Sequence, residues 1–261
     1  MPKVVAVIPA RYASSRLPGK PLALIDGQPM IRRVVEGAAA TDLFDSVIVA
    51  TDDRRIFEVV SGFGGRAVMT RADHASGTDR VAEVAATMDA DIVVNVQGDL
   101  PFVSRALIEP PLEAMARDPS IPMATVSVPI VEREKWLDPN VVKVVTDAAG
   151  FALYFSRAPI PARRDEMTDC VEGAVLGRQH VGLYVYRREF LLRFASWAPT
   201  PLEQMEKLEQ LRVLERRERL FVAKVSESVV EVDTAADLER ASEISIARSR
   251  KPESTRRHEG A

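Results

Sequence analysis

The chain has 261 residues, 46% of them hydrophobic, which suffices to bury one α/β core with a sizeable insert. Its formal net charge of −3 argues against nucleic acid as a partner, and no apolar run approaches the ~20 residues that span a bilayer. The lone cysteine, Cys170, excludes an internal disulfide. Because no signal-peptide pattern precedes the first apolar run, we expect a cytoplasmic protein with no membrane partner.

In the first half of the chain, apolar runs alternate with helical patterns. The predicted elements are strands at Val4–Ile8, Ser46–Ala50, Arg66–Met69 and Asp91–Val96, and helices at Pro29–Ala40, Arg54–Phe63 and Thr78–Met88. Strands separated by helices of this length predict a parallel, doubly wound sheet. Ligands of such sheets lie beyond the carboxyl ends of the strands.

The second half of the chain is richer in strands. The predicted strands are Met123–Val128, Val141–Thr146, Phe151–Ser156, Val181–Tyr186, Leu220–Val225 and Val229–Val232. The turn 147–150 ends in glycine and predicts a hairpin of the second and third strands. A helix is expected to begin at Thr200, and another at Thr234 with Asp237 in the capping-box position. The charged tail 248–261 is expected to be disordered.

A basic loop follows the first predicted strand. That strand ends near Pro9 and leads into a run of small residues that carries Arg11, Arg16 and Lys20. Loops of this kind present backbone N–H groups and positive charge to phosphates. The loop lacks the glycine and lysine spacing of a Walker motif. A solvated loop is the alternative, but the position directly after a buried strand favours a triphosphate site.

Two aspartates stand where predicted strands end. Asp99 closes the segment Val94–Asp99 after Gly98, and Asp233 lies between a predicted strand and a capped helix. Mg²⁺ takes one or two carboxylates and completes its octahedron with phosphate oxygens and water. The two aspartates therefore predict one shared Mg²⁺ site, with ordinary turn residues as the alternative.

Two further polar groups are candidates for binding. The segment Asp73–Arg80 opens a helix, where Ser76 and Gly77 offer donors to a base or a phosphate, although plain helix capping explains the segment equally well. Over Leu202–Leu214 a single helix is expected. Its apolar face would hold Leu202, Met205, Leu208 and Leu211, and its other face would turn Glu203, Glu206 and Gln210 toward a pocket or a partner.

Taken together, these motifs resemble the 3-deoxy-manno-octulosonate (KDO) cytidylyltransferase family from Val4 to about Ala247. The segments that carry the resemblance are 8–22, Ala50–Asp52, Met69–His74, Ser76–Thr78, Asn95–Asp99, Val142–Val144, Leu153–Arg157, Leu202-Glu203, Leu208–Leu214 and Val232–Thr234. The resemblance implies a Rossmann-like α/β fold of the GT-A type with a mixed sheet. It also implies one domain over 1–247, with a smaller β-rich sugar-binding and dimerisation subregion over about 123–200.

The same resemblance implies CTP and KDO as substrates, Mg²⁺ as cofactor, a homodimer, and a CMP-KDO product used for lipopolysaccharide. Arg11, Lys20, Asp99 and Asp233 are then the expected catalytic residues, with the two aspartates as metal ligands. The expected nucleotide-binding residues are Pro9, Ala10, Arg11, Arg16, Lys20, Ser76, Gly77, Arg80 and Gln97. The expected sugar-binding residues are Arg157, Arg164, His180, Tyr184, Glu203, Glu206 and Gln210. His180 is given no acid–base role.

Alternatives remain at this point. Leu100 stands where the family usually has a glutamate after the Gln-Gly-Asp segment, which leaves open whether a second metal ion binds. Before Val232 the family usually carries glycine or proline, and this chain has Ser228–Glu231, so a related acid such as 8-amino-KDO is a second candidate acceptor. Sugar-1-phosphate nucleotidyltransferases usually open with a Gly-x-Gly pattern, and sialate cytidylyltransferases with Gly-Gly-Ser-Lys; both patterns are absent here. A non-catalytic nucleotide-binding protein is the remaining alternative, and the two aspartates argue against it.

Overall fold

The computed structural model describes residues 2–13, 17–162, 174–227 and 229–250. Arg16, Arg164 and Cys170 therefore lie outside the described residues. The strands are β1 (Val4–Ala10), β2 (Leu24–Ile25), β3 (Gln28–Pro29), β4 (Ser46–Thr51), β5 (Arg66–Met69), β6 (Ile92–Asn95), β7 (Met123–Ile130), β8 (Lys143–Thr146), β9 (Ala152–Ser156), β10 (Gly177–Arg187) and β11 (Leu220–Lys224). The helices are the 3-10 helix η1 (Lys20–Leu22) and α1 (Met30–Ala39), α2 (Arg54–Gly62), α3 (Gly77–Ala86), α4 (Arg105–Arg117), α5 (Arg133–Leu137), α6 (Arg188–Ala195), α7 (Pro201–Glu206), α8 (Leu211–Glu215) and α9 (Ala235–Arg250).

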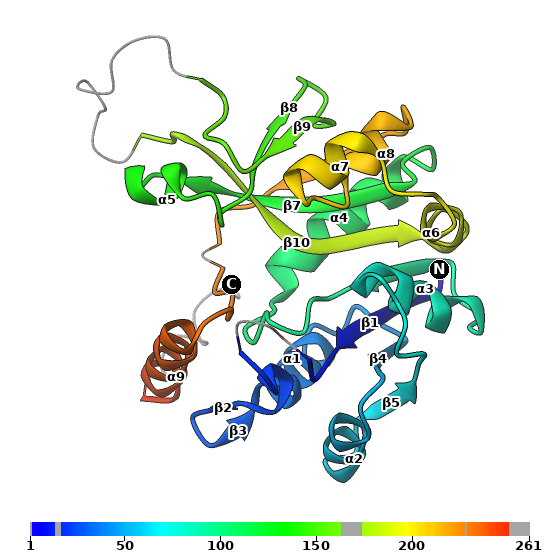
Figure 1. The fold of residues 1–261 in the computed structure, drawn as a ribbon, viewed down its shortest axis with the longest axis vertical. Helices are drawn as coiled ribbons and strands as arrows, with labels where there is room; N and C mark the ends of the chain where they lie inside the picture. Colours follow the sequence, from blue (N-terminus) through cyan, green and yellow to red (C-terminus); the bar gives the residue numbers. More distant parts are fainter. Residues whose placement is uncertain (1, 14–16, 163–173, 228, 251–261) are drawn as a thin grey trace, which may run out of the picture.

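Within the described residues, nine strands form one mixed sheet whose main path runs β11-β7-β10-β6-β1-β4-β5 (Figure 1). Strand β1 is parallel to β4 and to β6, and β4 is parallel to β5. Strand β10 runs antiparallel to both β6 and β7, so its amino-terminal half lies at the edge where the other strands of the main path end. This single reversed strand brings a late segment of the chain to the ligand-binding edge of the sheet.

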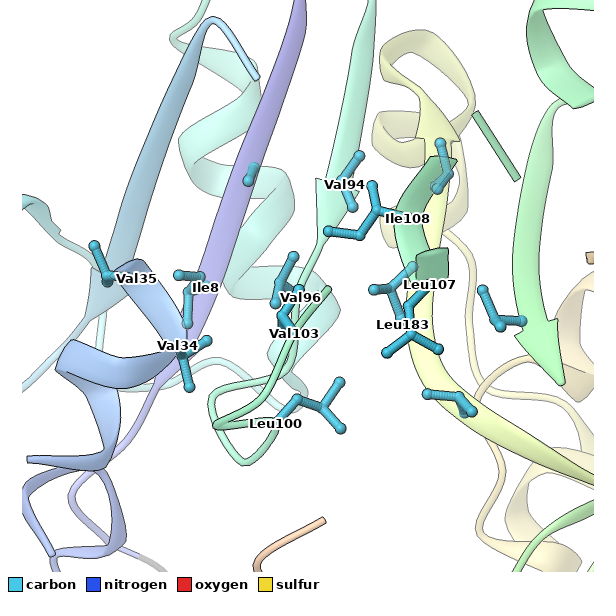
Figure 2. Close-up of a cluster of buried hydrophobic side chains, with 14 of the residues drawn as sticks. Ile8, Val34, Val35, Val94, Val96, Leu100, Val103, Leu107, Ile108 and Leu183 are labelled. Atoms are coloured by element: carbon cyan, nitrogen blue, oxygen red, sulfur yellow. The ribbon is translucent and has the colours of Figure 1, made fainter. Parts of the chain in front are cut away.

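Helices cover both faces of the sheet because the strands alternate their buried side chains. On β1, Ala6 and Ile8 pack into a cluster with α1, α2 and α4, whereas Val5 and Val7 pack into a second cluster with α3 and α6. Figure 2 shows the first cluster, in which Val34 of α1 and Leu107 of α4 accompany side chains from the central strands. The parallel strands are therefore apolar on both faces, as their continuous Val and Ile runs predict.

The first half of the chain confirms the predicted order of strands and helices. Strand β5 has the predicted bounds, and each end of the other predicted elements of this half lies within two residues of the observed one. The parallel, doubly wound arrangement is also confirmed. Helix α4 was not predicted, because Pro110 and Pro111 lie inside it, where proline usually ends a helix.

The second half follows the prediction less closely. The hairpin of β8 and β9 is confirmed, and it joins the main sheet through β10. Segment Val229–Val232 was predicted as a strand but forms irregular structure. The helix expected over Leu202–Leu214 is wrong as a single element. It divides into α7 and α8 at Lys207, whose φ of 55° cannot continue a right-handed helix.

The limits of the predicted domain concern two features, the β-rich subregion over 123–200 and the start of the tail at 248. Strands β7 and β10 belong to the main sheet, so the β-rich part over 123–200 is continuous with the rest of the core. Thr234 and Asp237 exchange the predicted capping-box hydrogen bonds at the start of α9. That helix continues to Arg250, three residues into the segment predicted as a disordered tail. Among the described residues, no helix has both the length and the hydrophobicity to cross a membrane.

Candidate active site

Two adjoining cavities lie at the carboxyl-terminal edge of the sheet. The first, here called the loop cavity, has a volume of about 450 Å³ and extends from the end of β1 to the loop after β6. The second, the β10 cavity, has a volume of about 380 Å³ and lies against the amino-terminal half of β10. Gly77, Gln97 and Asp99 line both cavities, so a ligand in one would meet a ligand in the other.

The loop cavity gathers most of the residues predicted to bind a nucleotide. Its lining includes Pro9, Ala10, Arg11, Lys20, Gly77, Gln97, Asp99 and Asp233. Gly19, with φ of 71°, donates from its N–H to the carbonyl oxygen of Tyr12 at 3.0 Å, which closes the loop after β1. Lys20 begins η1 directly after this turn, and its side chain therefore returns to the edge of the sheet.

The ammonium group of Lys20 joins the two aspartates. Its Nζ lies 2.8 Å from Oδ2 of Asp99 and 3.0 Å from Oδ1 of Asp233. Burial lowers the pKa of Lys20, but the two carboxylates outweigh this effect and the pKa lies above its ordinary value. The predicted convergence of Asp99 and Asp233 is therefore present, with a lysine between them.

Close backbone contact brings the loop after β6 over β1. A Cβ atom at Gly98 would lie 2.9 Å from the carbonyl oxygen of Pro9, so only glycine permits this approach. The tight turn places Gln97 and Asp99 beside the end of β1. The Gln97 side chain donates from Nε2 to Oδ1 of Asn95 at 3.3 Å, which orients it toward both cavities.

The start of α3 has a capping role and a bridging role at once. Ser76 caps the helix and its Oγ donates to Oε1 of Glu209 at 3.1 Å, while Thr78 Oγ1 donates to Oε2 at 2.9 Å. Burial raises the pKa of Glu209, and the two hydroxyls and Arg212 oppose that rise. Gly77 faces both cavities, whereas the side chain of Ser76 is occupied by the bridge.

Arg80 was predicted to read the base, and its position argues against direct contact. The guanidinium is fully buried on the side of α3 that packs on the sheet. Its Nη2 lies 3.0 Å from Oδ2 of Asp52, and its Nη1 donates to Oγ1 of Thr70. These partners lie after β4 and β5, and Arg80 lines neither cavity.

The β10 cavity gathers the residues predicted to bind the sugar. His180, Tyr184, Arg157 and Gln210 all line it. Tyr184 donates from its hydroxyl to Oε1 of Gln210 at 3.1 Å. Nε2 of Gln210 is buried and has no hydrogen-bond partner within the described residues, so a ligand with an acceptor at that point would satisfy it.

His180 is held as a neutral imidazole. Its Nε2 lies 3.0 Å from Oγ1 of Thr125, and that hydroxyl donates to the carbonyl oxygen of Leu183 at 2.7 Å. The hydroxyl oxygen can therefore accept a hydrogen bond from the Nε2–H group of neutral His180. Burial lowers the pKa of His180 to about 3, which agrees with the absence of an acid–base role in the prediction.

Glu203 and Glu206 have structural partners in place of the predicted sugar contacts. Glu203 completes the capping box of α7 and accepts from Nε of Arg212 at 2.7 Å. Glu206 accepts from the N–H of Arg157 at 2.9 Å and from Oγ of Ser156 at 2.7 Å. Neither glutamate lines the β10 cavity. The break at Lys207 explains the difference, because the face assignment assumed one continuous helix.

The break at Lys207 also explains two further differences between the predicted helix and the structure. Met205 was predicted to be buried, and it is 79% exposed. Glu209 was not predicted as a site residue, yet it lines the β10 cavity between the two short helices. Asn140, Gln179 and Glu231 line this cavity too. Glu231 alternates with the apolar Val230 and Val232, a pattern that could have identified it as facing the site.

The charges at the edge of the sheet fit a divalent cation. Burial, followed by the charges of Asp99 and Asp233, raises the pKa of Glu231 to about 7. The two aspartates share one ammonium group, that of Lys20, as their ion-pair partner. The converging carboxylates are the oxygen donors that Mg²⁺ prefers. Within the described residues no group of three or more His, Cys, Asp or Glu side chains is arranged to hold a metal, so the remaining ligands would be substrate oxygens and water.

Comparison with known proteins agrees with this arrangement. The cytidylyltransferase family model matches residues 5–220. A 3-deoxy-manno-octulosonate cytidylyltransferase of Syntrophotalea carbinolica is 55% identical, covering 91% of this chain and 96% of the relative. One of Geobacter metallireducens is 54% identical over the same shares.

Solved structures show the same likeness. The structure of a CMP:2-keto-3-deoxy-manno-octonic acid synthetase complexed with CTP is 43% identical, with a TM-score of 0.87, and covers 94% of this chain and 99% of that one. A glucose-1-phosphate thymidylyltransferase of Bacillus anthracis, 16% identical with a TM-score of 0.65, shares the fold. The resemblance inferred from the motifs is confirmed. The chain belongs to the 3-deoxy-manno-octulosonate cytidylyltransferase family of nucleotidyltransferases.

Proposed function

We propose that this protein transfers CMP from CTP to KDO, which yields CMP-KDO and pyrophosphate for lipopolysaccharide synthesis. The observation that carries the proposal is the pair of adjoining cavities. One is lined by Arg11, Lys20 and two aspartates, and the other by Arg157 and neutral polar groups. A nucleoside triphosphate suits the first cavity and an acidic sugar the second. The family relatives carry the same activity in their names.

The reaction needs little covalent chemistry from the protein. The C2 hydroxyl of the sugar attacks the α-phosphorus of CTP and loses its proton to water; an oxygen–phosphorus bond forms, and the bond to pyrophosphate breaks. Arg11 and Lys20 line the loop cavity, where their charge opposes the negative charge that develops on the leaving group. Arg157 offers a guanidinium to the sugar carboxylate, and Tyr184 and Gln210 offer partners to its hydroxyls.

Mg²⁺ is part of the proposal, with Asp99 and Asp233 as its protein ligands. When bound, it would supply charge neutralisation on the phosphates and lower the pKa of an attacking hydroxyl. Lys20 lies between the two carboxylates in this structure and would pair with phosphate oxygens in the loaded enzyme. Leu100 is 2% exposed and offers no ligand, so these two aspartates are the expected carboxylate donors.

The test is pyrophosphate release from CTP, UTP and GTP, each with and without KDO. We expect release only with CTP and KDO together. Release without KDO, or a preference for UTP, would contradict the proposal. Replacing KDO by 8-amino-KDO in the same assay decides between the two candidate acceptors.

We also propose that the protein is a homodimer, as the family resemblance implies. Sedimentation velocity at micromolar concentration is expected to give one species of twice the mass of the chain. A monomer under assay conditions would overturn this part of the proposal and leave the proposed reaction untouched.

A further inference from the structure

Lys143 is a fully buried lysine that the proposed reaction does not use. It begins β8, and its Nζ donates to three backbone carbonyl oxygens: those of Asp138 at 2.9 Å, Val141 at 2.6 Å and Arg157 at 2.6 Å. Three acceptors use all three donors of an ammonium group. Within the described residues Lys143 has no carboxylate partner at ion-pair distance; its Nζ contacts carbonyl oxygens, and the carboxylates of Asp138 and Glu206 favour its charge from farther away. Burial lowers its pKa.

The three carbonyls belong to two segments that both reach the β10 cavity. Asp138 and Val141 enclose a short loop whose Asn140 lines the cavity, and Arg157 lines it from the end of β9. Arg157 donates from Nη1 to the carbonyl oxygen of Pro139 at 3.0 Å. The ammonium group of Lys143 and the guanidinium of Arg157 therefore bind carbonyl oxygens of the same loop and join that loop to β9.

Arg157 is held at several atoms. Its N–H donates to Oε2 of Glu206 at 2.9 Å, its Nε donates to the carbonyl oxygen of Glu206 at 2.7 Å, and its own carbonyl oxygen accepts from Lys143. Glu206 thus fixes one side of the Arg157 backbone and Lys143 fixes the other. Lys143 itself does not line the cavity, so any effect on a ligand must pass through Arg157 or the loop.

We propose that Lys143 is a positioning residue that fixes Arg157 and the Asp138–Val141 loop for recognition of the carboxylate of the acidic sugar. The proposal rests on the proposed function, because it assigns that carboxylate to Arg157. A guanidinium binds a carboxylate through two parallel hydrogen bonds only when its plane is fixed. Displacement of such a group by 1 Å can cost a factor of about 10².

The test compares Lys143→Met with Lys224→Met, a matched control at an exposed lysine on β11. In Lys143→Met we expect the apparent KM for KDO to rise about tenfold or more, because the three carbonyls lose their common donor. The KM for CTP is expected to stay within about twofold, because the CTP residues lie in the loop cavity. Lys224→Met should change neither constant. An unchanged KM for KDO, or equal increases for both substrates, would overturn the inference.

A double-mutant cycle separates positioning from a general loss of structure. In an Arg157→Gln background, Lys143→Met is expected to raise the KM for KDO by less than about twofold, because the group that it positions is gone. Additive effects would overturn the inference. A second readout is the rate with KDO carboxamide as the acceptor, because the amide lacks the negative charge of the carboxylate. Wild type and Lys143→Met should use it equally well, and a tenfold difference between them would contradict the proposal.

Two controls separate failure of this inference from misfolding of the variant and from failure of the proposed function. If Lys143→Met does not fold, Lys143→Gln keeps two N–H donors and is expected to show a smaller but selective rise in the KM for KDO. If its KM values match those of wild type, the inference fails. If wild type releases no pyrophosphate with CTP and KDO, the proposed function fails instead. The two failures are therefore distinguishable in one set of assays.

Discussion

At the scale of single residues, Lys20 has the most informative surroundings. It is the cation between Asp99 and Asp233, and it is only 15% exposed. Lys20→Ala is expected to lower kcat about 10²-fold or more, because positive charge in a water-poor site counts most where negative charge develops. Steady-state kinetics with CTP and KDO check this, and circular dichroism confirms the fold. A folded variant with normal kcat would exclude the role.

His180 gives a prediction about pH. Its folded pKa of about 3 lies below the ordinary value of 6.5, so between these values the unfolded state binds the extra proton. Stability is therefore lost as the pH falls from 6.5 toward 3. Substituting His180→Gln should reduce the slope of unfolding free energy against pH by up to about 1.4 kcal/mol per unit in this window.

Urea denaturation of wild type and His180→Gln at several pH values measures this difference. At pH 8 the slopes of the two proteins should agree, since His180 is neutral in both the folded and the unfolded state. Identical slopes between pH 3 and 6.5 would show that the buried imidazole does not resist protonation.

At the scale of elements, periodicity predicted β1, β4 and β6 because strands buried on both faces carry unbroken apolar runs. Periodicity could not predict that α7 and α8 are separate helices. The positive φ that divides them lies at Lys207, where no glycine marks the end of a helix. Nor could periodicity predict the burial of Arg80, whose partner Asp52 lies in the loop after β4. The convergence of Asp99 and Asp233 could be predicted because Asp99 follows a recognisable strand and Asp233 precedes a capped helix.

The join between α7 and α8 supports a prediction about Glu203. Its side chain is 11% exposed and pairs with Arg212, which is 7% exposed. Glu203→Ala would remove the closest carboxylate from a buried cation and leave only Glu209, at 3.9 Å, and we expect a loss of about 3 kcal/mol in unfolding free energy. The matched change Glu218→Ala, at a more exposed ion pair with Arg193, should cost much less.

Urea denaturation measures both losses, and kinetics provide the second readout. In folded Glu203→Gln, we expect the KM for KDO to stay near that of wild type. If this variant were fully stable and its KM for KDO rose tenfold, Glu203 would be a sugar contact, as first predicted, and the structural role would be wrong.

At the scale of the whole molecule, one edge of the sheet unites residues from both halves of the chain. Asp99 follows β6, near the centre of the sheet, whereas Asp233 precedes α9, which packs near β2. The N–H of Val232 donates to the carbonyl oxygen of Asp99 at 3.0 Å, so the backbone itself joins the two segments. Convergence of the carboxylates is therefore a property of the fold and does not depend on Lys20 alone.

This convergence carries the metal prediction. Asp99→Asn and Asp233→Asn should each abolish activity, since each removes a charged ligand of the proposed Mg²⁺. Thermal unfolding should change little, because the two side chains are 29% and 34% exposed and each single variant leaves Lys20 paired with the other carboxylate. Asp89→Asn, at a side chain 97% exposed, is the matched control and should stay active.

Removal of the ion itself is the last test. Excess EDTA is expected to stop pyrophosphate release, and added Mg²⁺ should restore it in wild type but not in the two aspartate variants. Isothermal titration adds a readout independent of turnover: Mg²⁺ should bind wild type in the presence of CTP, and binding should weaken in Asp99→Asn and Asp233→Asn alike. Full activity in EDTA would remove the metal from the proposed reaction. Equal Mg²⁺ binding by all three proteins would place it elsewhere than between these aspartates.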